Sequence, residues 1–268
     1  MNYRHAFHAG NFADVAKHLT LVAALLQLQK KPGAVAVVDT HAGRGSYDLS
    51  GSEARRTGEA AAGIGRLTDL TGGPEALAVY LGAALGGQSY PGSPLLAAKL
   101  LRPQDRLVAV EKHPEDAAAL RAALQPFAKA RVDEADGYQR LTGLLPPPER
   151  RGLILIDPPF EAPGEFAALG HSFAAAYRRF ATGVYLLWFP LKSASEANGF
   201  CGEVLAAGVT KLLRLDIRLK AAPEGKLAAA GLLIVNPPWQ LRADLQDALA
   251  LILPRLEAEA EIRTLAGE

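Results

Sequence analysis

The sequence has few of the features that mark disulfide-rich, metal-binding or membrane-spanning proteins. Its 268 residues include a single cysteine, Cys201. One thiol excludes an intramolecular disulfide and any metal site built from several cysteines, and it fits a reducing compartment. The apolar run from Leu21 to Leu26 is too short to cross a bilayer, and no signal-peptide cleavage pattern follows it. We therefore expect a cytoplasmic protein that does not span a membrane.

An excess of charge of one sign is also missing. The chain has 29 basic and 28 acidic residues, which gives a formal net charge of +1. A polycationic surface that binds nucleic acid non-specifically is therefore excluded, and any nucleic-acid contact must come from local patches. Internal repeats and low-complexity tracts are absent as well. The 49% of hydrophobic residues is ample for a sizeable core, so we expect one α/β domain over residues 1–268.

Apolar runs that alternate with helical patterns predict the architecture. A helix is expected over residues 11–30, and strands are expected at 34–38, 107–110, 130–135, 153–156 and 184–188. This alternation is typical of a Rossmann-like α/β fold, with a mostly parallel sheet covered by helices on both faces. The strands at 210–219 and 232–235 have only a short loop between them, so we expect an antiparallel pair at one edge. Residues 47–91 are expected to form an inserted helical subdomain.

Four of the early strands end in polar or glycine-rich residues. The carboxyl ends of parallel strands meet at one sheet edge, where ligands of such folds bind. Glu111 is suited to a vicinal diol, Asp136 could accept from an adenine amino group, and Gly43 would admit a compact tail. We therefore expect an elongated ligand that contains adenosine. The four strand ends are Asp39 to Gly45, Glu111, Asp136-Gly137 and Asp157 to Phe160.

The last of these strand ends, Asp157-Pro158-Pro159-Phe160, suits a flat amine. Asp157 and the Pro158 carbonyl could accept the two amino hydrogens, and Phe160 could stack on the ring that carries the amine. A similar stretch runs from Asn236 to Trp239. It lies near the C-terminus, after the other strand ends of the ligand type, so we interpret it as structural.

These strand ends resemble those of the class I S-adenosylmethionine-dependent methyltransferases that modify exocyclic amines. Three further stretches narrow the resemblance to one family: the N-terminal block from Tyr3 to Asn11, Lys17-His18, and Tyr90 to Pro94. With them the chain is similar to the bacterial ribosomal RNA large subunit methyltransferase J family, which makes N6-methyladenosine in 23S ribosomal RNA. Phe160 departs from that pattern, because the family has Tyr at this position; stacking survives the change but a phenol hydrogen bond is lost.

The resemblance implies an enzyme with S-adenosylmethionine as cofactor and 23S ribosomal RNA as partner. It implies that Asp157 is the catalytic aspartate, and the residues themselves predict that Pro158 and Phe160 complete the catalytic site. The resemblance implies that Tyr3 contacts RNA, and we expect Arg4 and His5 of the same N-terminal element to do so as well. It implies that the cofactor is held by His18, His41, Ser93, Glu111, Asp136, Gly137 and Asp157, with Lys17 close by, and we expect the glycine turn to add Gly43.

Other interpretations stay open at this point. A related enzyme could methylate DNA adenine or a protein glutamine, since both chemistries place a polar residue before Pro-Pro-aromatic. A non-catalytic RNA-binding protein with a methyltransferase-like fold is the alternative from another class. A dehydrogenase is disfavoured because the glycine turn lacks the Gly-x-Gly-x-x-Gly pattern. We expect no metal, because His8 and His18 lack the spacing of a helical zinc site, and we expect a monomer.

Overall fold

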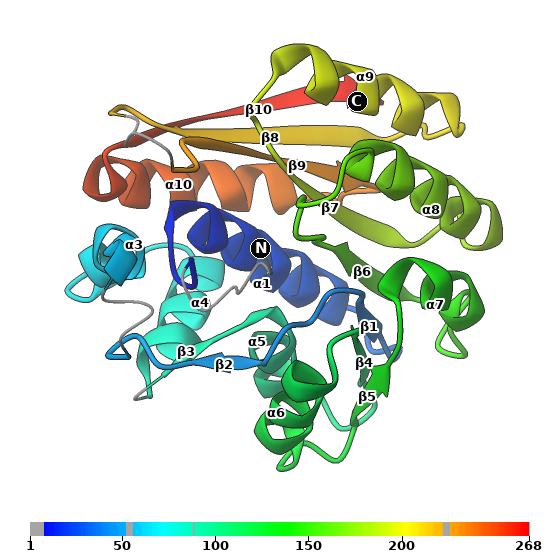
Figure 1. Ribbon diagram of the computed structural model, residues 1–268, viewed down its shortest axis with the longest axis horizontal. Coiled ribbons are helices and arrows are strands. Elements are labelled where there is room, and N and C mark those ends of the chain that lie inside the picture. Colours follow the sequence, from blue (N-terminus) through cyan, green and yellow to red (C-terminus); the bar gives the residue numbers. More distant parts are fainter. Residues whose placement is uncertain (1–7, 52–55, 88, 222–225, 268) are drawn as a thin grey trace.

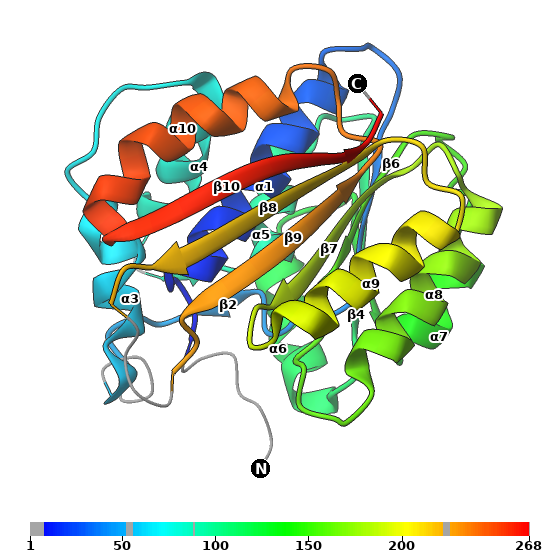
Figure 2. The same ribbon diagram turned by 90° about the horizontal axis from the view of Figure 1, so that it is seen from above.

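The computed structural model describes residues 8–51, 56–87, 89–221 and 226–267. A single twisted sheet crosses the molecule, and helices cover it on both faces (Figures 1 and 2). A separate two-stranded sheet, β2 and β3, lies beside it. This arrangement confirms the predicted Rossmann-like α/β fold.

The large sheet has eight strands in the order β10-β8-β9-β7-β6-β1-β4-β5. The five strands β5, β4, β1, β6 and β7 are parallel, and their carboxyl ends therefore lie at one edge. The strands of the sheet are β1 (Ala36–Asp39), β4 (Arg106–Glu111), β5 (Ala130–Glu134), β6 (Gly152–Ile156), β7 (Val184–Pro190), β8 (Leu212–Leu219), β9 (Ala229–Val235) and β10 (Ala258–Ala266).

Two hydrophobic clusters lie on opposite faces of the sheet and explain the helical layers. One face is covered by α1 (Phe12–Gln29), α4 (Glu75–Leu85), α5 (Ser93–Leu100), α6 (Pro114–Leu124) and α10 (Leu241–Leu256). The other face is covered by α7 (Gly137–Leu144), α8 (Glu165–Arg179) and α9 (Ala194–Ala206). Because both faces of the sheet are covered, every residue of β1 and β6 is buried. All of these residues are apolar except Asp39, at the end of β1.

Helix α1 begins directly after Asn11, which caps it. The side chain of Asn11 accepts hydrogen bonds from the backbone N–H groups of Ala13 and Asp14, which satisfies donors that a helix start leaves free. The helix packs against α4, α5 and α10 as well as the sheet, so it is buried over almost four turns. This burial includes Lys17 and His18, two polar residues that an exposed amphipathic helix would present to water.

The segment between β1 and α5, where the inserted subdomain is predicted, contains β2 (Ser46–Tyr47), α3 (Glu59–Ala62), the short helix η2 (Ile64–Leu67), α4 and β3 (Tyr90–Pro91). Its strands pair with each other as an antiparallel ladder. Its buried side chains, among them Leu67, Leu77 and Tyr80, belong to the same hydrophobic cluster as α1 and the sheet.

The C-terminal part of the sheet differs from the sequence prediction in one respect. Strands β8 and β9 do form an antiparallel pair, as expected. They do not form the outermost edge, because β9 pairs with β7 on one side and the unpredicted strand β10 covers β8 on the other. Strand β10 was not predicted because its first four residues are Ala and Glu, which are depleted in strands. Helix α7 was also missed, because Gly137 and Gly143 weaken its helical pattern.

None of the helices in the described residues is both long enough and apolar enough for a membrane crossing.

Candidate active site

The loop after β6 lies near the middle of the sheet, where β1 and β7 flank the strand. Its first side chain, Asp157, is 15% exposed, so the carboxylate is reachable from outside but largely surrounded by protein. Pro158 is buried behind it. Phe160 adopts a backbone φ of 49°, which a non-glycine residue takes only when its surroundings enforce it.

Packing of aromatic rings supplies that enforcement. The Phe160 ring lies edge-on to Phe166, with centroids 4.9 Å apart, and edge-on to Trp188 at 5.8 Å. Both partners are partly buried, and Phe166 belongs to the start of α8. The ring of Phe160 is therefore fixed close to Asp157 in the chain, and the residue is only partly buried.

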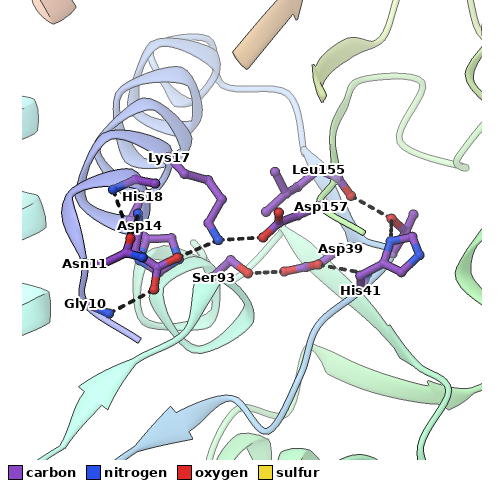
Figure 3. Close-up of polar contacts among 12 residues, drawn as sticks. Gly10, Asn11, Asp14, Lys17, His18, Asp39, His41, Ser93, Leu155 and Asp157 are labelled. Carbon is purple, nitrogen blue, oxygen red and sulfur yellow. Dashed lines mark hydrogen bonds and ion pairs between the residues drawn. The ribbon is translucent and has the colours of Figure 1, made fainter. Parts of the chain in front are cut away.

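Helix α1 brings a lysine to the same loop (Figure 3). The Nζ of Lys17 donates to Oδ2 of Asp157 at 2.5 Å and to Oδ1 of Asp14 at 2.7 Å. Only 4% of the Lys17 side chain is exposed. Burial alone lowers the pKa of this lysine, but the two carboxylates outweigh burial and raise it well above its usual range. Lys17 therefore stays a cation and balances Asp157.

The end of β1 adds a second carboxylate, Asp39. It is buried, accepts from the Ser93 hydroxyl at 2.6 Å and receives the backbone N–H of His41 at 3.4 Å. Burial raises the pKa of Asp39 to about 7, the hydrogen bond from Ser93 works against that shift, and the charge of Asp157 adds to it. Ser93, a residue predicted to hold the cofactor, is thus held in place by Asp39. The sequence places Asp39 at the start of the glycine turn but does not predict that it contacts a ligand.

His41 follows in the same turn. Its Nδ1 shares a hydrogen bond of 2.8 Å with the Thr40 hydroxyl, and its ring meets Tyr138 edge-on at 4.9 Å. Burial lowers the pKa of His41 to about 4, so the ring is neutral near pH 7. The residue therefore offers a planar, uncharged surface at the carboxyl end of β1.

The glycine turn itself is tied to Glu111 at the end of β4. Oε2 of Glu111 accepts the backbone N–H of Gly43, and Oε1 accepts that of His113, both at 2.8 Å. Gly43 has a φ of 61°, and a Cβ there would lie 2.3 Å from the Tyr47 hydroxyl. The carboxylate of Glu111 is thereby oriented at the sheet edge, with lone pairs left for hydroxyl groups of a ligand.

Asp136 and Gly137 join β5 to α7. Asp136 caps the helix through the N–H groups of Tyr138 and Gln139, and its other oxygen lies 3.0 Å from Lys112. Burial raises the pKa of Asp136, but Lys112 and the capping N–H groups outweigh it and lower the pKa below its usual range. Gly137 has a packing role, because a Cβ there would lie 2.0 Å from the Thr40 carbonyl oxygen.

His18 lies deeper than the other residues predicted to hold the cofactor. Only 1% of it is exposed, and its Nδ1 hydrogen-bonds to the Tyr90 hydroxyl at 2.7 Å. The two rings stack at 5.5 Å, and Tyr90 continues to the Tyr80 hydroxyl at 3.1 Å. This buried chain supports the wall of the site next to Lys17.

The structure thus gathers the predicted strand ends at one edge, as the parallel register requires. Tyr3, Arg4 and His5 lie outside the described residues. Among the residues that are described, no group of three or more His, Cys, Asp or Glu side chains could hold a metal ion.

The second Pro-Pro copy lies at the opposite edge of the sheet. Strand β9 runs antiparallel to β7, so its end at Val235 pairs with Tyr185 at the beginning of β7. The Asn236 amide donates to the carbonyl groups of Ala181 and Gly183, both at 2.8 Å. This position and these local contacts fit the structural interpretation of the Asn236 copy.

Comparisons with known proteins agree with this geometry. Residues 32–265 match the family model described as ribosomal RNA large subunit methyltransferase D, RlmJ. The chain is 39% identical over 263 residues to the ribosomal RNA large subunit methyltransferase J of Escherichia coli K12, covering 96% of this chain and 94% of the relative. For the Haemophilus influenzae protein of the same name, the identity is 38% over 267 residues, with 97% and 95% covered.

A solved structure of a Legionella pneumophila protein is also similar. It has a TM-score of 0.88 and 32% identity, and the match covers 96% of this chain and 98% of that chain.

Proposed function

Because the chain belongs to the ribosomal RNA large subunit methyltransferase RlmJ family, we propose that it methylates the N6 amine of an adenosine in 23S ribosomal RNA with S-adenosylmethionine as donor. The observation that carries this proposal is the hydrogen bond from the buried Lys17 to Asp157 at the carboxyl end of β6. DNA adenine, protein glutamine and a non-catalytic RNA-binding role are the alternatives that the test below must exclude.

The cofactor contacts are inferred from the polar side chains at the carboxyl ends of the parallel strands. Glu111 would accept the two ribose hydroxyl protons, because its carboxylate is already oriented by Gly43 and His113. Asp136, His41 and the Gly43 turn would surround the adenine and the chain that follows it. When bound, S-adenosylmethionine supplies an electrophilic methyl group on a sulfonium. The carboxylates of Glu111, Asp136 and Asp157 and the neutral ring of His41 fit such a cationic ligand.

The adenine amino nitrogen is a weak nucleophile, because its lone pair is delocalised into the ring. To reach the site, the target base leaves its stack, at a cost of a few kcal/mol. Phe160 then compensates for part of this cost, because stacking of a base on an aromatic ring contributes about 1–3 kcal/mol. The fixed position of Phe160 beside Trp188 means that little side-chain freedom is lost when the base arrives.

Asp157 and the Pro158 carbonyl would each accept one amino hydrogen. Lys17 engages Oδ2 of Asp157, and Oδ1 has no hydrogen-bond partner within the described part of the chain. That oxygen is therefore available to the amine. Two acceptors in these positions favour a pyramidal nitrogen whose lone pair faces the methyl group, so positioning and electrostatics provide most of the catalysis. Asp157 need not remove a proton before transfer, since the amine becomes acidic once it carries the positive charge.

The test measures the product in cells and with purified protein. Nucleosides of 23S ribosomal RNA from cells that lack the protein should lose one N6-methyladenosine by mass spectrometry, and the wild-type gene should restore it. Asp157→Ala should fail to restore it, while calorimetry shows that the purified variant still binds S-adenosylmethionine. An unchanged 23S pattern would refute the RNA substrate. A wild-type protein that binds no S-adenosylmethionine would instead support the non-catalytic alternative.

A further inference from the structure

A second feature lies at the same edge of the sheet, beyond β7. It is a cavity of about 210 Å³ lined by Leu191, Ala194, Asn198, Arg214, Asp216, Arg218 and Arg263. Three guanidinium groups face one carboxylate there, in a protein whose formal net charge is only +1. None of these residues takes part in the site around Asp157.

Strand geometry explains why the arginines meet. Arg214, Asp216 and Arg218 alternate along β8, so their side chains project from the same face of the sheet. Strand β10 runs antiparallel to β8 and places Arg263 directly opposite Arg214. Ala194 is the first residue of α9, so the positive end of that helix also faces the cavity.

Arg214 is held rigidly at the back of the cavity. Its Nε donates to Oδ1 of Asp216 at 2.7 Å, and its Nη1 donates to Oδ1 of Asn198 at 2.9 Å. The guanidinium also lies over the Phe189 ring at 5.6 Å, and only 4% of the residue is exposed. A guanidinium fixed in this way loses little conformational entropy when it binds an anion.

The other two arginines have donors to spare. Arg263 donates through Nη2 to Asp216 at 2.8 Å, but its Nε is buried and hydrogen-bonds to nothing in the described residues, although Glu261 lies 3.4 Å away. Arg218 is exposed at the mouth, and no ion pair to it is found within the described ranges. A buried N–H without an acceptor is unfavourable, and an anion in the cavity could satisfy it.

The cavity has a defined place relative to Asp157. Strand β8 runs parallel to β6, so its Arg218 end lies at the same edge as the catalytic loop. The two strands are three positions apart in the sheet, which corresponds to roughly 14 Å. Ring contacts from Phe160 through Phe166 and Phe189 to Arg214 connect the two places.

We propose that this arginine cavity binds a backbone phosphate of the RNA substrate, a few nucleotides from the adenosine that is methylated. Guanidinium groups match phosphate oxygens in geometry as well as in charge, and phosphate contacts fix the register of a nucleic acid on a protein. The proposal rests on the RNA substrate proposed above. The cavity would position the RNA strand, while the residues around Asp157 act on the base.

Arg218→Gln tests the proposal, because this side chain is exposed and forms no ion pair with any residue that the structure describes. The affinity for unmodified 23S ribosomal RNA should fall about tenfold, the factor that corresponds to one charge-assisted hydrogen bond. The salt dependence of binding should also become shallower, by about 0.7–1 in the slope of log K against log salt concentration. We expect KM for RNA to rise while kcat and the affinity for S-adenosylmethionine stay unchanged.

Arg178→Gln is the matched control. It removes the same charge from an exposed arginine near the end of α8, which leads into the amino end of β7 at the opposite edge. It should change RNA affinity less than twofold. Equal losses in the two variants would show a general charge effect, and an unchanged Arg218→Gln would remove the cavity from RNA binding; either result overturns the proposal.

Titration with inorganic phosphate at constant ionic strength distinguishes a free anion from a phosphodiester. If Arg218→Gln loses phosphate binding but keeps full RNA affinity, the cavity is a small-anion site and the proposal is wrong. Methylation by the wild-type protein reports separately on the proposed function. If the wild-type protein methylates RNA and the Arg218→Gln variant binds RNA with unchanged affinity, only the role of the cavity is overturned.

Discussion

Lys17 and Asp157 are 140 positions apart in the sequence, yet the lysine Nζ lies 2.5 Å from the aspartate Oδ2. Asp14 accepts from the same ammonium at 2.7 Å, so one buried cation is shared by two carboxylates (Figure 3). The arrangement joins α1 to the loop after β6. It makes the position of the Asp157 carboxylate depend on a residue of the N-terminal helix.

Replacing Lys17 with Met should destabilise the fold and lower activity. Breaking a buried ion pair by removing one partner costs about 3–5 kcal/mol of unfolding free energy. The Asp157 carboxylate also loses the donor that holds its Oδ2, so kcat should fall because the carboxylate is no longer fixed against the amine. Urea unfolding and kcat/KM measure the two effects.

Lys112→Met is the matched control for that variant. Lys112 also pairs with a carboxylate, that of Asp136 at 3.0 Å, but its side chain is 68% exposed. Exposed pairs contribute about 0–1 kcal/mol, so this variant should unfold nearly as the wild type does and keep its kcat. Equal effects of the two variants would mean that burial of Lys17 does not matter.

Asp39 should make the folded state less stable as the pH rises toward neutrality. Its pKa in the folded protein is about 7, against 3.8 as the ordinary value, so the folded state binds more protons between these limits. Asp39 therefore increases the free energy of unfolding below pH 4. This contribution is lost as the pH rises from 4 to 7. Its size is up to roughly 4 kcal/mol.

Asp39→Asn should remove this contribution while keeping the shape of the side chain. The measurement is the difference in unfolding free energy between variant and wild type at pH 4.5 and at pH 7.5. We expect the variant to gain stability relative to the wild type at the higher pH. A difference that does not change with pH would contradict the assignment.

Gly137→Ala should destabilise the junction between β5 and α7. The added Cβ would lie 2.0 Å from the Thr40 carbonyl oxygen, which is backbone and cannot turn aside. Overpacking of this kind typically costs about 1–3 kcal/mol, and the affinity for S-adenosylmethionine should fall as the Asp136 cap moves. Thermal unfolding and calorimetry measure these effects.

Gly202→Ala provides the comparison for that substitution. Gly202 lies inside α9, and a Cβ there meets nothing within 4 Å. Alanine in a helix interior is better than glycine by roughly 0.5–1 kcal/mol, so this variant should be slightly more stable than the wild type. Similar losses in both variants would show that contact with Thr40 is not the cause.

Substitutions of Phe160 and Trp239 should distinguish the two Pro-Pro stretches by their effects on activity. Phe160→Ala should lower kcat/KM for RNA about 5- to 150-fold, because the loss of one base stack corresponds to about 1–3 kcal/mol. Phe160→Tyr keeps the ring and should stay within threefold of the wild type. Trp239→Ala should have no effect on turnover, although Trp239 is 89% exposed, because it lies at the opposite edge.

Much of the site could be predicted because it depends on local order. Apolar runs predict strands, and the register of a parallel sheet then requires their carboxyl ends to share one edge. Glu111, Asp136 and Asp157 could therefore be grouped from sequence, and the structure places them at that edge. The alternation of strands and helices likewise predicts the fold class, since only a sheet covered on both faces buries such strands.

The remaining features depend on contacts between distant segments. Nothing in the pattern around Lys17 predicts its ion pair, because a buried lysine and an exposed one look alike until α1 is packed beneath α4, α5 and α10. Contacts between distant segments also explain the raised pKa of Asp39 and the order of β8, β9 and β10. They explain as well why Arg214 lies opposite Arg263. Sequence alone determined which chemical groups end the strands. Tertiary packing decided their charge and their neighbours, because desolvation and ion pairing depend on everything that surrounds a group in space.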